Sequence, residues 1–291
     1  LWVVAPSQAS GVGDAIDMLV TTPAFTAAVN VVYGLAGPAS TAAQALPFVA
    51  GVAGPLVALA AARSMRWSWP AAAVTAVVVA VAPEHVIHST RVKQYTLEAV
   101  IGLVAVALAW RSVRAGRAPW ALAALAAGGT LVSASAGVYA GSVLAAVTVV
   151  HLLAHRAEPR SQLCEASAPS AAFAGFALLW WAVYLRTHVP DGLRDYWRDH
   201  FLDADLGASL DRMTAGFLPL APAWPWFVLA AAVVVATRPR LALVLAMPVG
   251  AAILLATLEL APLGTGRTDI HLLPSAALAL GAAVDAVTRR A

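Results

Sequence analysis

The sequence predicts an all-α bundle of membrane-spanning helices. Of the 291 residues, 61% are hydrophobic and only 11% are charged, whereas soluble domains carry about 25% charged residues. The mean hydropathy of +0.79 agrees with this contrast. Runs such as residues 71–82 are apolar on every face, which excludes the alternating pattern of an outer-membrane barrel. Because hydrocarbon offers no hydrogen-bond partners, the backbone groups of these runs have to be satisfied within helices.

Nine apolar stretches each have the composition and approximate length of a spanning helix, which needs roughly 20 residues. They are residues 40–62, 69–87, 95–113, 118–135, 137–155, 167–187, 221–238, 241–260 and 268–288. We expect them to form one transmembrane domain over residues 1–291. The chain begins Leu-Trp-Val-Val, with neither an initiator methionine nor a signal-peptide pattern, so we expect a fragment that lacks the first span.

The basic residues predict the orientation of the bundle. Assigning alternate loops to one side collects eleven arginines and three acids there, 11 − 3 = +8, and leaves 7 − 12 = −5 on the other. The positive side holds Arg63, Arg66, Arg111, Arg114, Arg117, Arg156, Arg160, Arg238, Arg240, Arg289 and Arg290 with Glu158, Glu165 and Asp285. The positive-inside rule makes this side cytoplasmic. We therefore expect a multi-pass protein of the cytoplasmic membrane whose long, aromatic-rich loops face outward.

Two outer segments are predicted to carry short helices on the membrane surface. In residues 1–39, Pro23 suits the first turn of a helix, and the helix that follows, to about Gly37, is too short to span. In residues 188–220, five large side chains recur at i, i+3, i+4, i+7 and i+8 opposite charged residues, which indicates an interfacial helix. These five are Leu193, Tyr196, Trp197, His200 and Phe201.

A third outer segment, the loop 83–96, leads to a carboxylate one turn inside a span. A charge at the centre of a spanning helix costs about 2.5–3.5 kcal/mol, so Glu98 needs a partner. Arg91 and Lys93 lie one to two turns away. One interpretation is an ion-paired helix end whose cations extend to the interface. The functional alternative is that these cations bind a phosphate whose lipid tail stays in the bilayer, Arg91 as a bidentate fork and Lys93 as a point charge.

The last two spans are joined by a second candidate segment, Pro-Leu-Gly-Thr-Gly-Arg-Thr-Asp at 262–269. Its glycines allow close backbone approach to a ligand, and Arg267 adds a cation. A purely structural turn in which Arg267 pairs with Asp269 or Glu259 is the alternative.

No metal or other cofactor is predicted, although a divalent cation is compatible with the composition. His85 and His88 lie at i, i+3 beside Glu84 but lack a third ligand, which favours solvated or helix-capping histidines over a metal site. The acids at 191, 195, 199, 203 and 205 alternate with arginines, which favours salt pairing over cation binding.

Four motifs, in order along nearly the whole chain, resemble a known family. Arg91-Val92-Lys93-Gln94-Tyr95-Thr96-Leu97-Glu98 resembles the Arg-x-Leu/Val-Lys-Gln-Tyr-Ser-hydrophobic-Asp/Glu signature of bacterial GT-C glycosyltransferases, the family 39 group related to protein O-mannosyltransferases and lipid A aminoarabinose transferases. The other similar segments are Thr22-Pro23-Ala24-Phe25 with Tyr33 to Pro38 and Leu46-Pro47, Tyr196 to Leu202, and Gly264-Thr265-Gly266-Arg267 with Pro274.

The resemblance implies a mannosyltransferase-like enzyme that moves a sugar from a polyprenyl-phosphate donor to an acceptor at the outer face, with inversion at the anomeric carbon. It implies donor-phosphate contacts for Arg91, Lys93, Tyr95 and Arg267, and a substrate loop with Tyr196, Trp197 and His200. The family's acidic pair in the first outer loop has no counterpart in residues 1–39, where Asp14 and Asp17 are the only acids. We therefore expect the family's acidic pair to lie upstream of residue 1. Glu98 matches the second acidic position, so the catalytic candidates in this sequence are Glu98, Asp14 and Asp17.

Two other functions are compatible with a helical bundle: a transporter or flippase of lipid-linked or small substrates, and a non-catalytic membrane subunit. Transporters typically show internal repeats and polar groups at the membrane midplane. In this sequence the charges gather toward one face and no repeat is evident, which favours the transferase. The sequence specifies neither the sugar nor the acceptor.

Overall fold

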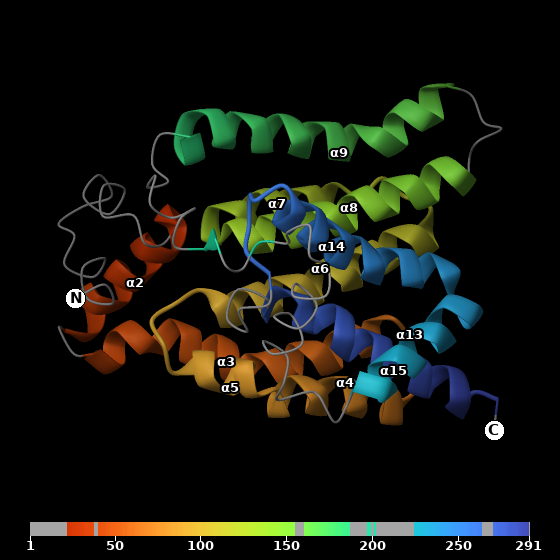
Figure 1. Ribbon diagram of the computed structural model, residues 1–291, viewed down its shortest axis with the longest axis horizontal. Coiled ribbons are helices and arrows are strands. Elements are labelled where there is room, and N and C mark those ends of the chain that lie inside the picture. The colour runs from red at the N-terminus through yellow and green to blue at the C-terminus, as the bar shows by residue number, and fades with distance from the viewer. Residues whose placement is uncertain are drawn as a thin grey trace.

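The computed structural model describes residues 22–37, 40–154, 160–186, 197–198, 201, 224–263 and 270–290. Across these ranges the chain is helical and contains no strand, which confirms the predicted all-α class. The long helices lie side by side along the longest dimension of the molecule, and α2 crosses one end of them (Figure 1).

The helices follow the apolar stretches of the sequence. They are α2 (Pro23–Ala36), α3 (Ser40–Ser64), α4 (Trp69–Val81), α5 (Pro83–Ser89), α6 (Tyr95–Ala115), α7 (Trp120–Val132), α8 (Ala134–Ala154), α9 (Arg160–Trp180) with the π-helical η2 (Trp181–Leu185), α13 (Trp224–Thr237), α14 (Pro239–Thr257), the 3-10 turn η5 (Ile270–Leu272) and α15 (Leu273–Thr288).

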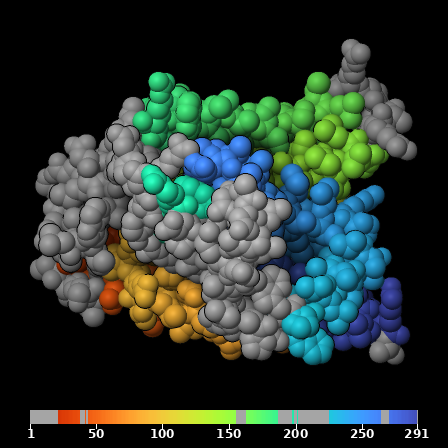
Figure 2. All heavy atoms as spheres, in the orientation of Figure 1, coloured from red at the N-terminus to blue at the C-terminus, as the bar shows by residue number. Residues whose placement is uncertain are grey.

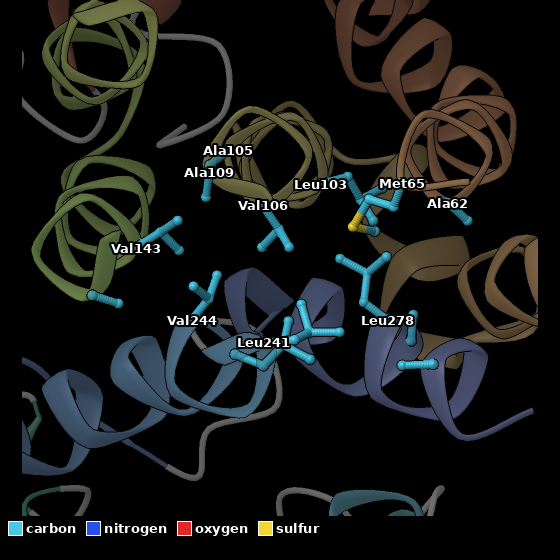
Figure 3. Close-up of a cluster of buried hydrophobic side chains, with 14 of the residues drawn as sticks. Ala62, Met65, Leu103, Ala105, Val106, Ala109, Val143, Leu241, Val244 and Leu278 are labelled. Atoms are coloured by element: carbon cyan, nitrogen blue, oxygen red, sulfur yellow. The ribbon is translucent and has the colours of Figure 1, made fainter. Parts of the chain in front are cut away.

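The core forms around α6, which packs against α3, α7 and α8 and also touches α14 and α15. Most of its buried side chains are alanine, valine and leucine. In Figure 3, Val106 of α6 points toward Leu241 and Val244 of α14, and Met65, the residue after α3, lies beside Leu278 of α15. Small side chains let helices approach closely enough for dispersion contacts, which supply much of helix association where lipid is as apolar as the core.

The number of spans differs from the nine expected. In the described residues six helices are long and apolar enough to cross a membrane: α3, α6, α8, α9 with η2, α14, and η5 with α15. The pair α4 and α5 makes a seventh if counted as one broken span, while α2, α7 and α13 are shorter. At 1.5 Å per residue, the 13 residues of α7 reach only about 20 Å. Each of the nine stretches contains a helix in its described residues, but a count of nine complete spans is not confirmed.

Two local breaks explain where α4 and α7 end. The expected span 69–87 ends at Val81 because a residue before proline disfavours helical backbone; Ala82, before Pro83, has φ −60° and ψ 117°. The helix resumes at Pro83 after a bend of 57°, so much of the expected loop 83–96 is helix α5. The other break is Ser133, whose extended backbone (φ −162°, ψ 136°) is the single residue between α7 and α8.

The predicted short helix near the N-terminus is confirmed. It begins with Thr22 as N-cap and Pro23 in the first turn, and ends at Gly37 with φ 83°. In Figure 1 it lies at the end of the bundle opposite the C-terminus. Most of the expected interfacial segment 188–220 lies outside the described residues.

Helix α9 forms one edge of the bundle (Figures 1 and 2) and packs against α7 and α8. Leu178, Leu179 and Val183 are each more than 60% exposed. Such an exposed apolar surface is typical of a helix side that contacts lipid.

Candidate functional site

Helix α5 is held in place by a carbonyl that a proline leaves without its helical donor. Pro55 has no N–H, so the carbonyl of Gly51, four residues earlier in α3, lacks the usual hydrogen bond. The Nε2 atom of His85 lies 3.0 Å from this oxygen. Because a carbonyl only accepts, Nε2 carries the proton and donates it. The side chain is 2% exposed, so the contact joins α5 to α3 inside the protein.

Close approach of the two helices requires small residues on α3. A Cβ atom placed on Gly54 would lie 2.7 Å from Nε2 of His85, and one on Gly51 would lie 2.4 Å from Cβ of Ser89. Any larger residue at either position would push α5 away. The glycines and Pro55 together therefore set the position at which α5 crosses α3.

The turn after α5 carries the cations that the sequence singled out. The backbone N–H of Arg91 donates to the carbonyl of His88, and that of Lys93 donates to the carbonyl of Arg91 over 2.8 Å. Arg91 is exposed, within electrostatic reach of Glu84, and Lys93 is half-buried. The ring of Tyr95 meets the ring of His88 edge-on at 4.7 Å between centroids. The segment from Arg91 to Tyr95 is thus anchored at both ends.

Glu98 lies one turn into α6 and is 1% exposed. Its Oε1 atom accepts a hydrogen bond of 2.5 Å from the hydroxyl of Ser133. The extended backbone of Ser133 between α7 and α8 brings this hydroxyl to the start of α6. The sequence suggested Arg91 or Lys93 as partners of Glu98, and it did not indicate Ser133. Hydrogen bonds to an ionised group contribute about 1.5–3 kcal/mol, so this contact accounts for part of the stabilisation that a buried carboxylate needs.

Helix α2 covers the same end of the bundle. The hydroxyl of Thr22 donates to the carbonyl of Val132, the residue before Ser133. Phe25 and Val29 are each 2% exposed and belong to a small apolar cluster with four partly buried neighbours. These neighbours are Tyr33, Leu46, Val92 and Leu97. The N-terminal helix therefore packs over the segment that carries Arg91, Lys93 and Glu98.

Deeper in the bundle, polar side chains join α8 to the start of α15. The hydroxyl groups of Tyr139 and Ser275 are 2.9 Å apart. The ring of His271 in η5 meets the ring of Tyr139 edge-on, 6.4 Å between centroids. Both η5 and α8 pack against α6. In the sequence, η5 follows directly after residues 264–269, which contain Arg267 and lie outside the described residues.

The structure brings four of the predicted site residues together, namely Arg91, Lys93, Tyr95 and Glu98, at the end of the bundle where α6 begins. Trp197 is described as a half-buried turn residue. The remaining candidates lie outside the described residues: Asp14, Asp17, Tyr196, His200 and Arg267.

The burial of His85 and His88 differs from the prediction. We expected His85 and His88 to be solvated or to cap a helix, but they are 2% and 1% exposed. His85 contacts Gly51, and Nε2 of His88 lies 3.5 Å from Oε2 of Glu84. No group of three potential metal-ligating side chains occurs within the described ranges. The spacing of Gly51 and Pro55 was the sequence signal for the role of His85, since a mid-helix proline always frees the carbonyl four residues before it.

The chain matches no known protein-family profile and no curated protein sequence. Its fold does match solved structures. One is the crystal structure of ArnT from Cupriavidus metallidurans bound to undecaprenyl phosphate, with a TM-score of 0.64 and 20% identity over 98% of this chain and 55% of that one. Another is ArnT from the same organism in the apo state, with a TM-score of 0.57 and 19% identity over 98% and 54% of the two chains. The chain therefore spans about half the length of these structures and shares their transmembrane fold, as its resemblance to GT-C glycosyltransferases implied.

Proposed function

We propose that this protein is a glycosyltransferase that moves a sugar from a polyprenyl-phosphate donor to an acceptor at the outer face of the cytoplasmic membrane. The proposal rests on one juxtaposition. The Arg91 to Tyr95 segment, with two cations, directly precedes the buried carboxylate of Glu98 at one end of a membrane bundle. A donor that is half isoprenoid and half phosphate-sugar needs a cationic surface at such a boundary between water and lipid. The fold supports the proposal, because ArnT, a GT-C glycosyltransferase, was crystallised with undecaprenyl phosphate.

In the proposed reaction, an acceptor hydroxyl attacks the anomeric carbon from the side opposite the phosphate. The bond between C1 and the phosphate oxygen breaks, its electrons leave with polyprenyl phosphate, and the hydroxyl proton passes to a carboxylate. Arg91, Lys93 and Arg267 neutralise the charge that develops on the leaving phosphate, and Tyr95 helps to orient it.

Two roles for carboxylates follow from the site. Glu98 is buried and held by Ser133, so its proposed role is to organise the donor site behind Lys93 and Tyr95. Proton acceptance contributes about 10²–10⁴-fold to such reactions and needs a carboxylate within reach of the acceptor. Asp14 and Asp17 are the candidates in this chain for that role, and Tyr196, Trp197 and His200 for substrate-loop contacts.

The test is turnover by the purified protein in lipid nanodiscs with polyprenyl-phosphate mannose or polyprenyl-phosphate aminoarabinose as donor. Released polyprenyl phosphate is measured by mass spectrometry. The variants Arg91→Ala, Lys93→Ala and Arg267→Ala are expected to lower turnover by at least tenfold each, because each loses one charge-assisted contact of about 1.5–3 kcal/mol. Arg114→Ala, an exposed arginine at the end of α6 far along the chain from this site, is the matched control.

Unchanged turnover in all three variants would remove the proposed site. Movement of the intact donor between leaflets without release of polyprenyl phosphate would instead identify a flippase.

A further inference from the structure

The opposite end of the bundle contains a buried carboxylate that ties three segments of the chain together. Asp285 of α15 is fully buried. Its Oδ1 accepts the backbone N–H of Ser68 over 2.5 Å, and its Oδ2 accepts Nη2 of Arg238 over 2.5 Å and Nε of Arg289 over 2.8 Å. The α3–α4 turn, the α13–α14 junction and the end of α15 therefore converge on one side chain. The positive-inside pattern predicts that this end is cytoplasmic.

Three of the arginines at this end are occupied by internal contacts. Arg238 and Arg289 bind Asp285, and Arg289 also donates to the carbonyl of Arg66. Arg63 donates to the carbonyl of Trp67, and its guanidinium lies over the ring of Trp69 at 4.3 Å. These contacts fix the backbone of all three segments.

The other three arginines point outward from the same framework. Arg66, Arg240 and Arg290 are exposed, and in the part of the chain described here their side chains make no hydrogen bond or ion pair. The backbone of Arg66 has φ 63°, a left-handed conformation that is uncommon outside glycine. The carbonyl of Arg66 is held there by Arg289. Arg66 and the Arg289–Arg290 pair are therefore neighbours through a direct contact.

The balance of charge at this end is strongly positive. The described segments 63–69, 237–241 and 285–290 contain six arginines and one acid, 6 − 1 = +5. The single acid, Asp285, is buried beneath the arginines. An anion approaching from outside therefore meets guanidinium groups alone on these segments.

Exposed apolar side chains adjoin the arginines. Trp69 is 65% exposed beside Arg63, and Val235 and Val287, each 61% exposed, lie within one turn of Arg238 and Arg290. Indole rings favour the headgroup level of a bilayer, and exposed valines on an apolar helix suit acyl chains. A soluble anion would use only the cations, whereas a phospholipid would use both features.

We infer that this end of the bundle binds the headgroup of an anionic phospholipid. The phosphodiester lies against the guanidinium forks of Arg66 and Arg290, with Arg240 at the rim, and the acyl chains lie along Val235 and Val287. Arginine suits this role because its planar fork binds phosphate oxygens in pairs. Asp285 acts beneath the site by holding the three segments in register. The site lies at the other end of the bundle from Glu98, so it does not depend on the proposed transferase reaction.

The experiment titrates the purified protein in detergent with phosphatidylglycerol and counts bound lipids by native mass spectrometry. The test variant combines Arg66→Gln, Arg240→Gln and Arg290→Gln. The matched control combines Arg111→Gln, Arg114→Gln and Arg117→Gln, which removes the same charge from exposed arginines at the end of α6. None of the six side chains has a described internal contact, and thermal unfolding verifies that both variants remain folded.

An arginine near an anionic membrane surface strengthens binding on the order of 5-fold, so the test variant should bind phosphatidylglycerol about 10-fold to 100-fold more weakly. The control should change by less than about 3-fold, since its arginines lie outside the site. Equal losses in both variants would show general attraction to a positive surface and overturn the inference, as would no loss in the test variant. Displacement of the lipid by excess inorganic phosphate would overturn the lipid assignment in favour of a site for free anions.

Discussion

Pro55 and His85 should depend on each other energetically, because the proline creates the acceptor that the histidine uses. Replacing His85 with leucine removes the side-chain donor to the Gly51 carbonyl, which Pro55 has already deprived of its helical N–H, and leaves this oxygen buried. An unsatisfied buried carbonyl costs about 1–3 kcal/mol. Replacing Pro55 with alanine restores a backbone N–H at the position that normally serves Gly51. In the alanine background, His85→Leu should therefore cost about 1–2 kcal/mol less than in the wild type.

A double-mutant cycle measures this coupling. The wild type, the two single variants and the double variant are unfolded in mixed micelles of increasing SDS content, with tryptophan fluorescence as the signal. Pro47→Ala is the matched control, since Pro47 is also inside α3 but the carbonyl that it frees belongs to residue 43. His85→Leu should be additive with Pro47→Ala. If His85→Leu costs the same with proline or alanine at position 55, the hydrogen bond is not what holds α5 to α3.

Two described contacts and the proposed phosphate site each lead to a further prediction. Ser133→Ala should lower the free energy of unfolding by about 1.5–3 kcal/mol, since Glu98 loses its hydroxyl donor. The control is Ser142→Ala, because the Ser142 hydroxyl donates to a carbonyl of its own helix. Equal effects of the two substitutions would contradict the assignment. Asp285→Ala should destabilise the protein by about 3–5 kcal/mol in the same unfolding assay, because Arg238 and Arg289 lose their shared carboxylate. A cost below about 1 kcal/mol would mean that water can take the place of the carboxylate at both arginines. Arg91→Lys should reduce turnover severalfold although it keeps the charge, because lysine lacks the bidentate fork; full activity would show that only the charge matters.

The sequence predicted where the helices lie along the chain, but it predicted their lengths less accurately. Composition and apolar runs are enough to place helices, because the bilayer leaves no alternative for the backbone. Whether a run forms one span or two pieces depends on single residues such as Pro83 and Ser133. Pro83 is visible as a breaker, but the extended backbone of Ser133 follows from tertiary contacts and has no comparable signal in the sequence.

The candidate site shows the same division between local and distant information. Arg91, Lys93, Tyr95 and Glu98 are close in sequence, so a helix start that carries them was predictable. The hydroxyl that binds Glu98 comes from 35 residues further along the chain. His85 was misjudged because its acceptor depends on a proline in another helix. Pairings across helices require the three-dimensional arrangement, which spacing alone does not provide.

The separation of Glu98 and Ser133 along the chain also bears on how the protein is synthesised and inserted into the membrane. Ser133 is synthesised 35 residues after Glu98, which takes a few seconds at about 5–20 residues per second. During this interval α6 carries a carboxylate whose insertion into lipid costs up to about 3.5 kcal/mol. Insertion of α6 therefore becomes more favourable once α7 and the beginning of α8 have emerged from the ribosome. On this basis we expect α6, α7 and α8 to enter the bilayer as one group.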